Sequence, residues 1–171
     1  MNYIKKLEKM QACSPAVDFC RGKPLKVAWK TCERGDWLLW ILARTCIQGS
    51  VKHRKIVLSA CACARLSLKF VKKGEKRPLK AIETAEKWAK KEKGVTLKMI
   101  KAAACATSAD DATYAYAYAY TATYAATCAA TCAACAATYA ATCAATYAAR
   151  KKILKKCAEI VRDNFPEPPK F

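Results

Sequence analysis

Residues 112–149 read ATYAYAYAYTATYAATCAATCAACAATYAATCAATYAA and contain no charged residue. The 38 positions hold 19 alanines, 8 threonines, 7 tyrosines and 4 cysteines. Alanine is the strongest helix former and a poor strand former, so the tract predicts helix. This includes the YAYAYAY run at 114–120, although its alternation also suits a half-buried strand. Because a long uncharged helix needs protein around it, we expect the tract to form the centre of the fold.

The larger side chains of this tract recur at spacings of four and three residues. A 4-4-3 pattern is an eleven-residue repeat, which keeps these side chains on one side of a nearly straight helix. The opposite side is alanine alone, so another helix can approach it closely. A single helix over residues 97–164 would be roughly 100 Å long, so we expect a break, with residues 107–111 as the best position. The helix side with the larger side chains carries Tyr124, Cys128, Cys132, Cys135, Tyr139, Cys143 and Tyr147.

The length of the uncharged tract also raises the question of a membrane span. Threonine and tyrosine fill 15 of its 38 positions, and alanine is nearly neutral toward lipid, so the tract is less apolar than a spanning helix. At the N-terminus, residues 1–10 (MNYIKKLEKM) carry charges where a secretory signal has an apolar core. We therefore expect a cytoplasmic protein with no membrane partner.

Start and stop signals predict further helices outside the tract. We expect Gly35 to stop one helix, Asp36 to cap the next, which ends at Gly49, and Ser50 and Thr96 to cap two later ones. The fold class is all-α, a compact bundle of about six to eight helices around long Ala/Thr/Tyr-rich central helices. Residues 1–165 form one domain, followed by an extended Pro-rich tail at 166–171. The expected helices outside the tract cover residues 2–12, 24–34, 36–48, 51–71, 78–93 and 150–164.

The chain is strongly basic, with 32 Lys and Arg against 13 Asp and Glu and a formal charge of +19. Residues 52–101 alone hold 16 basic and 4 acidic residues. Such a charge attracts nucleic acid, anionic lipid, acidic protein and phosphorylated small molecules; a solvated lysine face that only aids solubility is the alternative. Within residues 78–93, the pattern places Leu79, Ile82, Ala85 and Trp88 inward and Lys80, Lys87, Lys90 and Lys91 outward.

No motif predicts catalysis, a metal or a cofactor. His53 is the single histidine, is flanked by basic residues and has no nucleophile nearby in sequence, so we expect a solvated surface residue. The twelve cysteines suit small buried hydrophobic residues in a reducing compartment. The Cys132-Ala-Ala-Cys135 spacing occurs in redox and zinc sites, but the neighbouring cysteines lie on the same helix side and cannot complete a tetrahedron, so packing is the expected role.

The tyrosines of residues 114–120 point to several sides of a helix, so they cannot all fill one seam. Core or interface packing is the main expectation, and stacking on a base or nucleotide beside Lys and Arg is the alternative. Asp110 and Asp111 suit helix capping, with a metal or cationic group as the alternative. The candidate ligand- or partner-binding residues are Tyr114, Tyr116, Tyr118, Tyr120, Arg65, Lys69, Arg77, Trp37, Asp110 and Asp111.

Several segments together resemble a known family. They are DWLLW at 36–40, Arg44, ACACARL at 60–66, and GEKRPLKAIETAEKWA at 74–89, followed by an Ala/Tyr-rich helix. The chain resembles, over about residues 28–163, the predicted immunity proteins of bacterial polymorphic toxin systems. This resemblance implies an all-α, non-enzymatic protein, and it assigns no functional residues.

The first functional hypothesis is therefore an immunity or inhibitor protein that binds an acidic toxin or effector through residues 52–101. A sponge that sequesters an anionic nucleotide in a Tyr and Lys/Arg pocket is the alternative. Weak nucleic-acid binding is third, and homo-oligomerisation is open.

Overall fold

The computed structural model describes residues 3–66, 68–70, 73–74, 76–108 and 147–171. This part of the chain is all helical, with eight α-helices, one short 3-10 helix and no strand. The predicted all-α class is confirmed, whereas the predicted central helices at residues 109–146 lie outside the described residues. The elements are α1 Tyr3–Lys9, α2 Ser14–Cys20, α3 Leu25–Thr31, α4 Gly35–Arg44, α5 Val51–Arg65, η1 Leu68–Phe70, α6 Arg77–Ala89, α7 Leu97–Ser108 and α9 Tyr147–Asn164.

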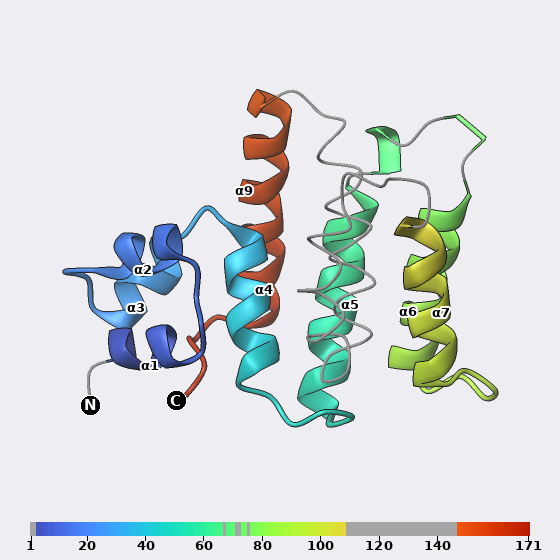
Figure 1. Cartoon of the computed structure of the whole chain (residues 1–171), viewed down its shortest axis with the longest axis horizontal. Coiled ribbons are helices and arrows are strands. Elements are labelled where there is room, and N and C mark those ends of the chain that lie inside the picture. The colour runs from blue at the N-terminus through green and yellow to red at the C-terminus, as the bar shows by residue number, and fades with distance from the viewer. Residues whose placement is uncertain (1–2, 67, 71–72, 75, 109–146) are drawn as a thin grey trace.

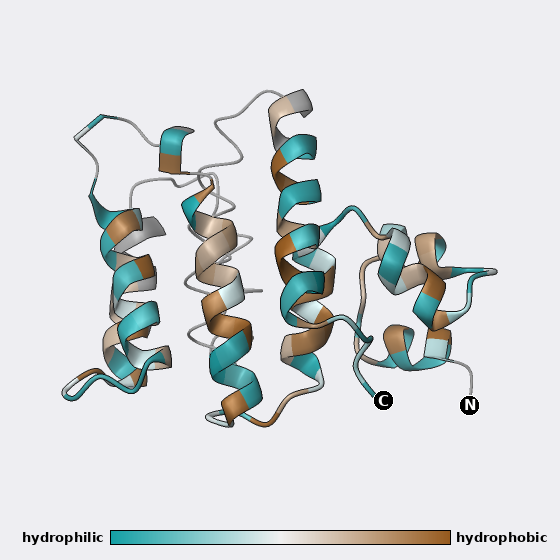
Figure 2. Ribbon diagram, turned by 180° about the vertical axis from the view of Figure 1, so that it is seen from behind, coloured by the Kyte–Doolittle hydropathy of each residue, from teal (hydrophilic) through white to brown (hydrophobic). Residues whose placement is uncertain are grey.

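The last helix of the chain lies between two early ones. α9 packs against both α4 and α5, and α6 packs between α5 and α7 (Figure 1). Figure 2 shows hydrophobic and hydrophilic residues alternating along α9, as expected for a helix that buries one side. The buried side consists of Ile153, Leu154, Cys157, Ala158 and Val161. The bundle is therefore assembled from segments far apart in sequence.

The segment that enters α4 lies very close to α9. Arg162 donates a hydrogen bond to the Cys32 carbonyl at 2.6 Å, and Lys155 pairs with Glu33 at 2.7 Å. Gly35 is buried where the two helices touch, and a Cβ atom there would lie 2.4 Å from the Cβ of Cys157. A side chain at position 35 would therefore collide with α9.

Two predictions about this segment are wrong. Gly35 is the first residue of α4 and not a helix stop, because its missing side chain is needed for the contact with α9. Asp36 lies inside the first turn, and its carboxylate binds the Arg34 guanidinium at 2.8 and 2.5 Å, so it does not cap the helix. Arg34 occupies the N-cap position without a side-chain cap bond.

Other helix boundaries follow the sequence more closely. The Ser50 hydroxyl accepts a hydrogen bond from the His53 backbone at 3.1 Å, and the Thr96 hydroxyl accepts one from Met99 at 3.3 Å, so both predicted caps are confirmed. The predicted helix to residue 48 ends at Arg44, where the Thr45 hydroxyl and amide both bond to the Ile41 carbonyl. The predicted helix to residue 71 ends at Arg65.

The C-terminal residues return to the small N-terminal helices. As predicted, residues 165–171 are not helical, and Trp29 donates a hydrogen bond to the Phe165 carbonyl at 3.0 Å. Lys26 pairs with Glu167 at 3.4 Å, and the Phe171 ring lies 6.5 Å from that of Tyr3. The tail thus joins the α1–α3 group to the bundle.

The prediction that His53 is a solvated surface residue is wrong, since its side chain is 0% exposed. Ser50 sets the start of α5, which places His53 on the inner side of the first turn. Its Nδ1 accepts a hydrogen bond from the amide of Gly49, the residue before the N-cap Ser50, at 2.9 Å. Its ring meets Trp88 edge to face at 5.3 Å, and its Nε2 has no hydrogen-bond partner among the described residues.

This burial predicts pH-dependent stability. Desolvation and, secondly, the charge of Arg54 lower the pKa of His53 in the folded protein. An unfolded histidine has a pKa of about 6.5, so below that pH the unfolded chain binds a proton that the folded protein does not. The contribution of His53 to the free energy of unfolding should be constant above pH of about 7. Below pH of about 6.5 it should fall by up to about 1.4 kcal/mol per pH unit, until the folded-state pKa is reached.

Denaturant unfolding at pH values of about 7.5, 6.5 and 5.5 measures this slope. The control is His53→Gln, whose side chain can still accept from the Gly49 amide but does not titrate. Equal slopes for the two proteins over this range would contradict the assignment to His53.

Candidate basic interface on helix α6

Helix α6 has one buried and one lysine-rich side. As the sequence pattern predicts, Ile82, Ala85 and Trp88 are buried against the bundle and the outward lysines are exposed. Leu79, also predicted inward, is only half-buried. Along the outer side, residues 76, 80, 83, 87 and 90 follow a 4-3-4-3 spacing, which places them on one helix face. We call the four exposed lysines of this row, Lys76, Lys80, Lys87 and Lys90, the α6 lysine face.

An ion pair between α5 and α6 neutralises one acidic group of this region. Arg65 Nε and Nη2 each donate to a carboxylate oxygen of Glu86 at 2.8 Å. The hydrogen bond to Arg65 lowers the pKa of Glu86, so the carboxylate is charged at neutral pH. Glu83 is then the one carboxylate within the 4-3-4-3 row, and the row keeps an excess of positive charge.

The C-terminal end of α6 is anchored to α5 by Arg54. Its Nη1 donates a hydrogen bond to the Trp88 carbonyl at 2.6 Å, and its guanidinium lies over the Trp88 ring at 4.5 Å. A cation close to the last carbonyls of a helix also opposes the negative end of the helix dipole. Arg65 and Arg54 thus both hold the C-terminal turn of α6, through Glu86 and Trp88, against α5.

Across the described residues, arginines mainly bind protein groups and lysines mainly face solvent. Besides the three pairs already described for Arg34, Arg54 and Arg65, Arg21 lies near Glu8 and Asp18, and Arg162 binds the Cys32 carbonyl. Lysines of the α6 lysine face form no ion pair within the described part of the chain. Since the acidic side chains are largely taken up by internal pairs, the positive charge of the lysines is left for a partner.

Three of the predicted site residues lie at one end of the bundle. Arg65 ends α5, Lys69 is in η1 and Arg77 begins α6, so topology places them together (Figure 1). Arg65 is engaged with Glu86, while Lys69 is exposed and Arg77 is half-buried. This end continues into the α6 lysine face.

Trp37 does not join them. It lies on α4, where its ring is 6.0 Å from that of Phe19 and 4.5 Å from the Arg34 guanidinium. α9 and α5 separate α4 from α6 (Figure 1). The remaining predicted site residues, Tyr114, Tyr116, Tyr118, Tyr120, Asp110 and Asp111, lie outside the described residues.

The α6 lysine face itself was absent from the predicted site, although its signal is in the sequence. The outward direction of Lys80, Lys87 and Lys90 was predicted, but a row of lysines also suits a solubilising surface. The structure adds that Glu86 binds Arg65, so the lysine row keeps its positive charge.

Four of the seven described cysteines support the packing role, whereas Cys13 is exposed and Cys20 and Cys46 are half-buried. Cys32, Cys61, Cys63 and Cys157 are buried, and burial raises the pKa of the Cys32 thiol to about 11 and that of Cys61 to about 12. Such thiols are poor nucleophiles and poor metal ligands at neutral pH. In the part of the chain that the structure describes, no group of three or more His, Cys, Asp or Glu side chains is placed to hold a metal ion. The Cys132 and Cys135 pair lies outside the described residues.

Among the described helices, none has the length and apolar character needed to cross a bilayer. Comparisons of the chain with protein-family models, curated proteins and solved structures found no match.

Proposed function

We propose that this protein is a non-enzymatic, cytoplasmic binding protein of the immunity or inhibitor type, which neutralises an acidic toxin or effector. The observation that carries the proposal is the α6 lysine face, an exposed row of like charges. Arg65 binds Glu86 beside this row, which leaves Glu83 as the one carboxylate within it. Complementary charge speeds encounter with a partner and sets orientation. The resemblance to predicted immunity proteins points in the same direction.

The shape of the row favours a macromolecular partner over a nucleotide. From residue 76 to residue 90 a helix extends roughly 20 Å, which is longer than a mononucleotide. Tight phosphate binding typically uses the two-pronged guanidinium of arginine. Here Arg65 is engaged with Glu86 and Arg54 with Trp88, so lysines carry the outer charge.

The position of Glu83 favours protein over nucleic acid. This carboxylate stands in the middle of the lysine row and would repel a phosphate backbone. A protein partner of mixed charge can place a basic side chain opposite Glu83 and acidic side chains opposite Lys80 and Lys87.

A charge-matched pair of variants tests the proposal. We expect the triple variant Lys80→Gln/Lys87→Gln/Lys90→Gln to weaken binding to the acidic partner about tenfold or more, mostly through slower association. The control, Lys151→Gln/Lys152→Gln/Lys156→Gln, removes three exposed lysines from α9 and should change the affinity little. The measurement is surface plasmon resonance with a partner obtained by affinity capture from the native host and identified by mass spectrometry.

Other outcomes would redirect the assignment. Equal weakening by the two triple variants would show an effect of net charge alone and contradict a role for α6. A thermal shift with one nucleotide, abolished by Tyr118→Ala or Arg65→Ala, would favour the nucleotide sponge. A steep fall of affinity for nucleic acid with salt, without a protein partner, would favour the third hypothesis.

A further inference from the structure

The turn between α4 and α5 carries two of the most exposed large apolar side chains described. Ile47 is 81% exposed and Val51 is 79% exposed, whereas Ile41 and Leu42 in the preceding helix are buried. An isolated exposed aliphatic residue is ordinary, but two of them on one turn, almost fully in solvent, form a protruding apolar tip. We call Ile47 and Val51 the apolar tip.

The turn is held in this position from both sides. On the α4 side, the Thr45 amide and hydroxyl bond to the Ile41 carbonyl. On the α5 side, the Gly49 amide donates to His53, and the Ser50 amide donates to the Ile47 carbonyl at 3.2 Å. The apolar tip is thus part of a hydrogen-bonded turn, and its exposure follows from the backbone path.

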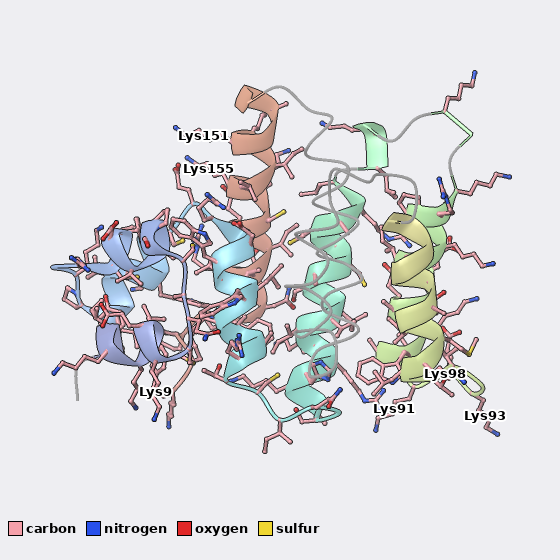
Figure 3. The ribbon with its side chains drawn as sticks, in the orientation of Figure 1. Lys9, Lys91, Lys93, Lys98, Lys151 and Lys155 are labelled. Carbon is pink, nitrogen blue, oxygen red and sulfur yellow. The ribbon has the colours of Figure 1, made fainter. Side chains whose placement is uncertain are left out.

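Exposed lysines lie on both sides of the apolar tip at the same end of the molecule. Lys52 follows Val51 directly and is exposed. Figure 3 shows Lys9, Lys91 and Lys93 at the lower end of the view, the end at which the α4–α5 turn also lies. All three are exposed, and none forms an ion pair within the described residues. This end therefore combines a small apolar tip with four lysines and one exposed carboxylate, Glu92, and keeps a net positive charge.

The charge and composition of this end indicate which surface it fits. A second copy of the chain would bring the lysines of two copies together, so self-association through this end is disfavoured. This end places lysines beside two exposed aliphatic side chains, whereas the α6 lysine face carries no exposed large apolar side chain that could enter a bilayer. Clusters of four or more lysines beside apolar side chains are typical of binding to anionic lipid headgroups.

We propose that the end of the molecule formed by the α4–α5 turn and the α6–α7 loop docks on an anionic lipid bilayer. Ile47 and Val51 enter the headgroup layer, and Lys9, Lys52, Lys91 and Lys93 contact anionic headgroups. The sequence led us to expect no membrane partner because the uncharged tract is too polar to span, but this adsorption needs no spanning helix. It uses residues other than Lys80 and Lys87, so it stands apart from the proposed acidic protein partner.

Co-sedimentation with vesicles of phosphatidylcholine, with and without phosphatidylserine, tests the proposal on the full-length protein. We expect binding to the phosphatidylserine vesicles only, weakened by added salt. The variant Ile47→Ser/Val51→Ser should reduce the partition coefficient at least about tenfold. Val27→Ser/Leu58→Ser, which alters two exposed aliphatic residues elsewhere, should leave it unchanged.

A second pair of variants tests the charges. Lys52→Gln/Lys93→Gln should weaken vesicle binding about tenfold, since each lysine near the surface adds attraction. Lys80→Gln/Lys87→Gln removes the same charge from the α6 lysine face and should have little effect. Far-ultraviolet circular dichroism and the melting temperature confirm that each variant is folded.

Failure to bind phosphatidylserine vesicles, or binding that is unchanged in Ile47→Ser/Val51→Ser, would overturn the proposal. If vesicles are not bound and Ile47→Ser/Val51→Ser instead weakens the acidic protein complex, the apolar tip belongs to a protein interface. Loss of protein binding in the α6 variants with vesicle binding intact would leave the membrane proposal standing, so the two proposals fail separately.

Discussion

Gly35→Ala should destabilise the protein by about 3 kcal/mol or more, lowering the melting temperature by roughly 10 °C. A Cβ atom at this position would lie 2.4 Å from the Cβ of Cys157 and 2.6 Å from the backbone nitrogen of Ala158. Two of the obstacles are backbone atoms of α9, so no side-chain rotation relieves the clash, and α4 and α9 must move apart. Helix propensity alone predicts the opposite sign, a gain of up to about 1 kcal/mol for alanine.

Thermal and denaturant unfolding of Gly35→Ala measure this effect. The matched control is Gly49→Ala, where a Cβ atom meets nothing within 4 Å but φ is +78°. We expect this control to cost about 1 kcal/mol from backbone strain alone. A second-site Cys157→Ala change should not rescue Gly35→Ala, because it leaves the Cβ of residue 157 in place. A melting temperature for Gly35→Ala equal to that of the wild type would show that the helices do not approach as described.

Trp88→Ala should cost about 3–5 kcal/mol, the range for removal of a large buried aromatic side chain. Trp88 is 7% exposed, packs edge to face with His53 at 5.3 Å and lies under the Arg54 guanidinium. Its removal leaves a cavity between α5 and α6 and takes away the cation–π contact with Arg54. Trp88→Phe keeps an aromatic ring there and should cost clearly less.

The pH dependence of Trp88→Ala gives an independent readout of the same contact. Water admitted beside His53 should raise its lowered pKa toward the value in the unfolded chain. The loss of stability below pH of about 6.5 should then be smaller in Trp88→Ala than in the wild type. Denaturant unfolding at several pH values compares the two. An unchanged slope would mean that Trp88 does not shield His53 from water.

Much of the fold was predictable because helices begin and end for local reasons. Ser50 and Thr96 cap helices as predicted, since a hydroxyl and an amide three residues later meet in any helix start. The inward side of α6 was predicted equally well, because its apolar residues recur at the helical period. The errors at Gly35 and His53 arise because a distant residue intervenes, whereas Asp36 binds the neighbouring Arg34 in place of capping the helix.

The candidate site was less predictable than the fold. The sequence identified the basic residues of the 52–101 region. It also grouped Trp37 with Arg65, Lys69 and Arg77, but the structure places Trp37 apart from them, on α4. Sequence patterns place residues on a helix face and do not state which faces meet. The pairing of Arg65 with Glu86, 21 positions apart, separates a charge used within the fold from the exposed lysines, and it is visible only in the assembled bundle.

The sequence alone determined the all-α class, the caps at Ser50 and Thr96 and the outward lysines of α6, because these depend on neighbours within one or two helical turns. The tertiary structure decided that α9 lies between α4 and α5, that Gly35 must lack a side chain and that His53 is buried. It also decided that the α4–α5 turn projects its apolar tip among lysines. The physical reason is that burial and close approach bring together atoms of residues far apart in the sequence, such as Gly35 and Cys157. No local sequence pattern encodes which of these residues meet.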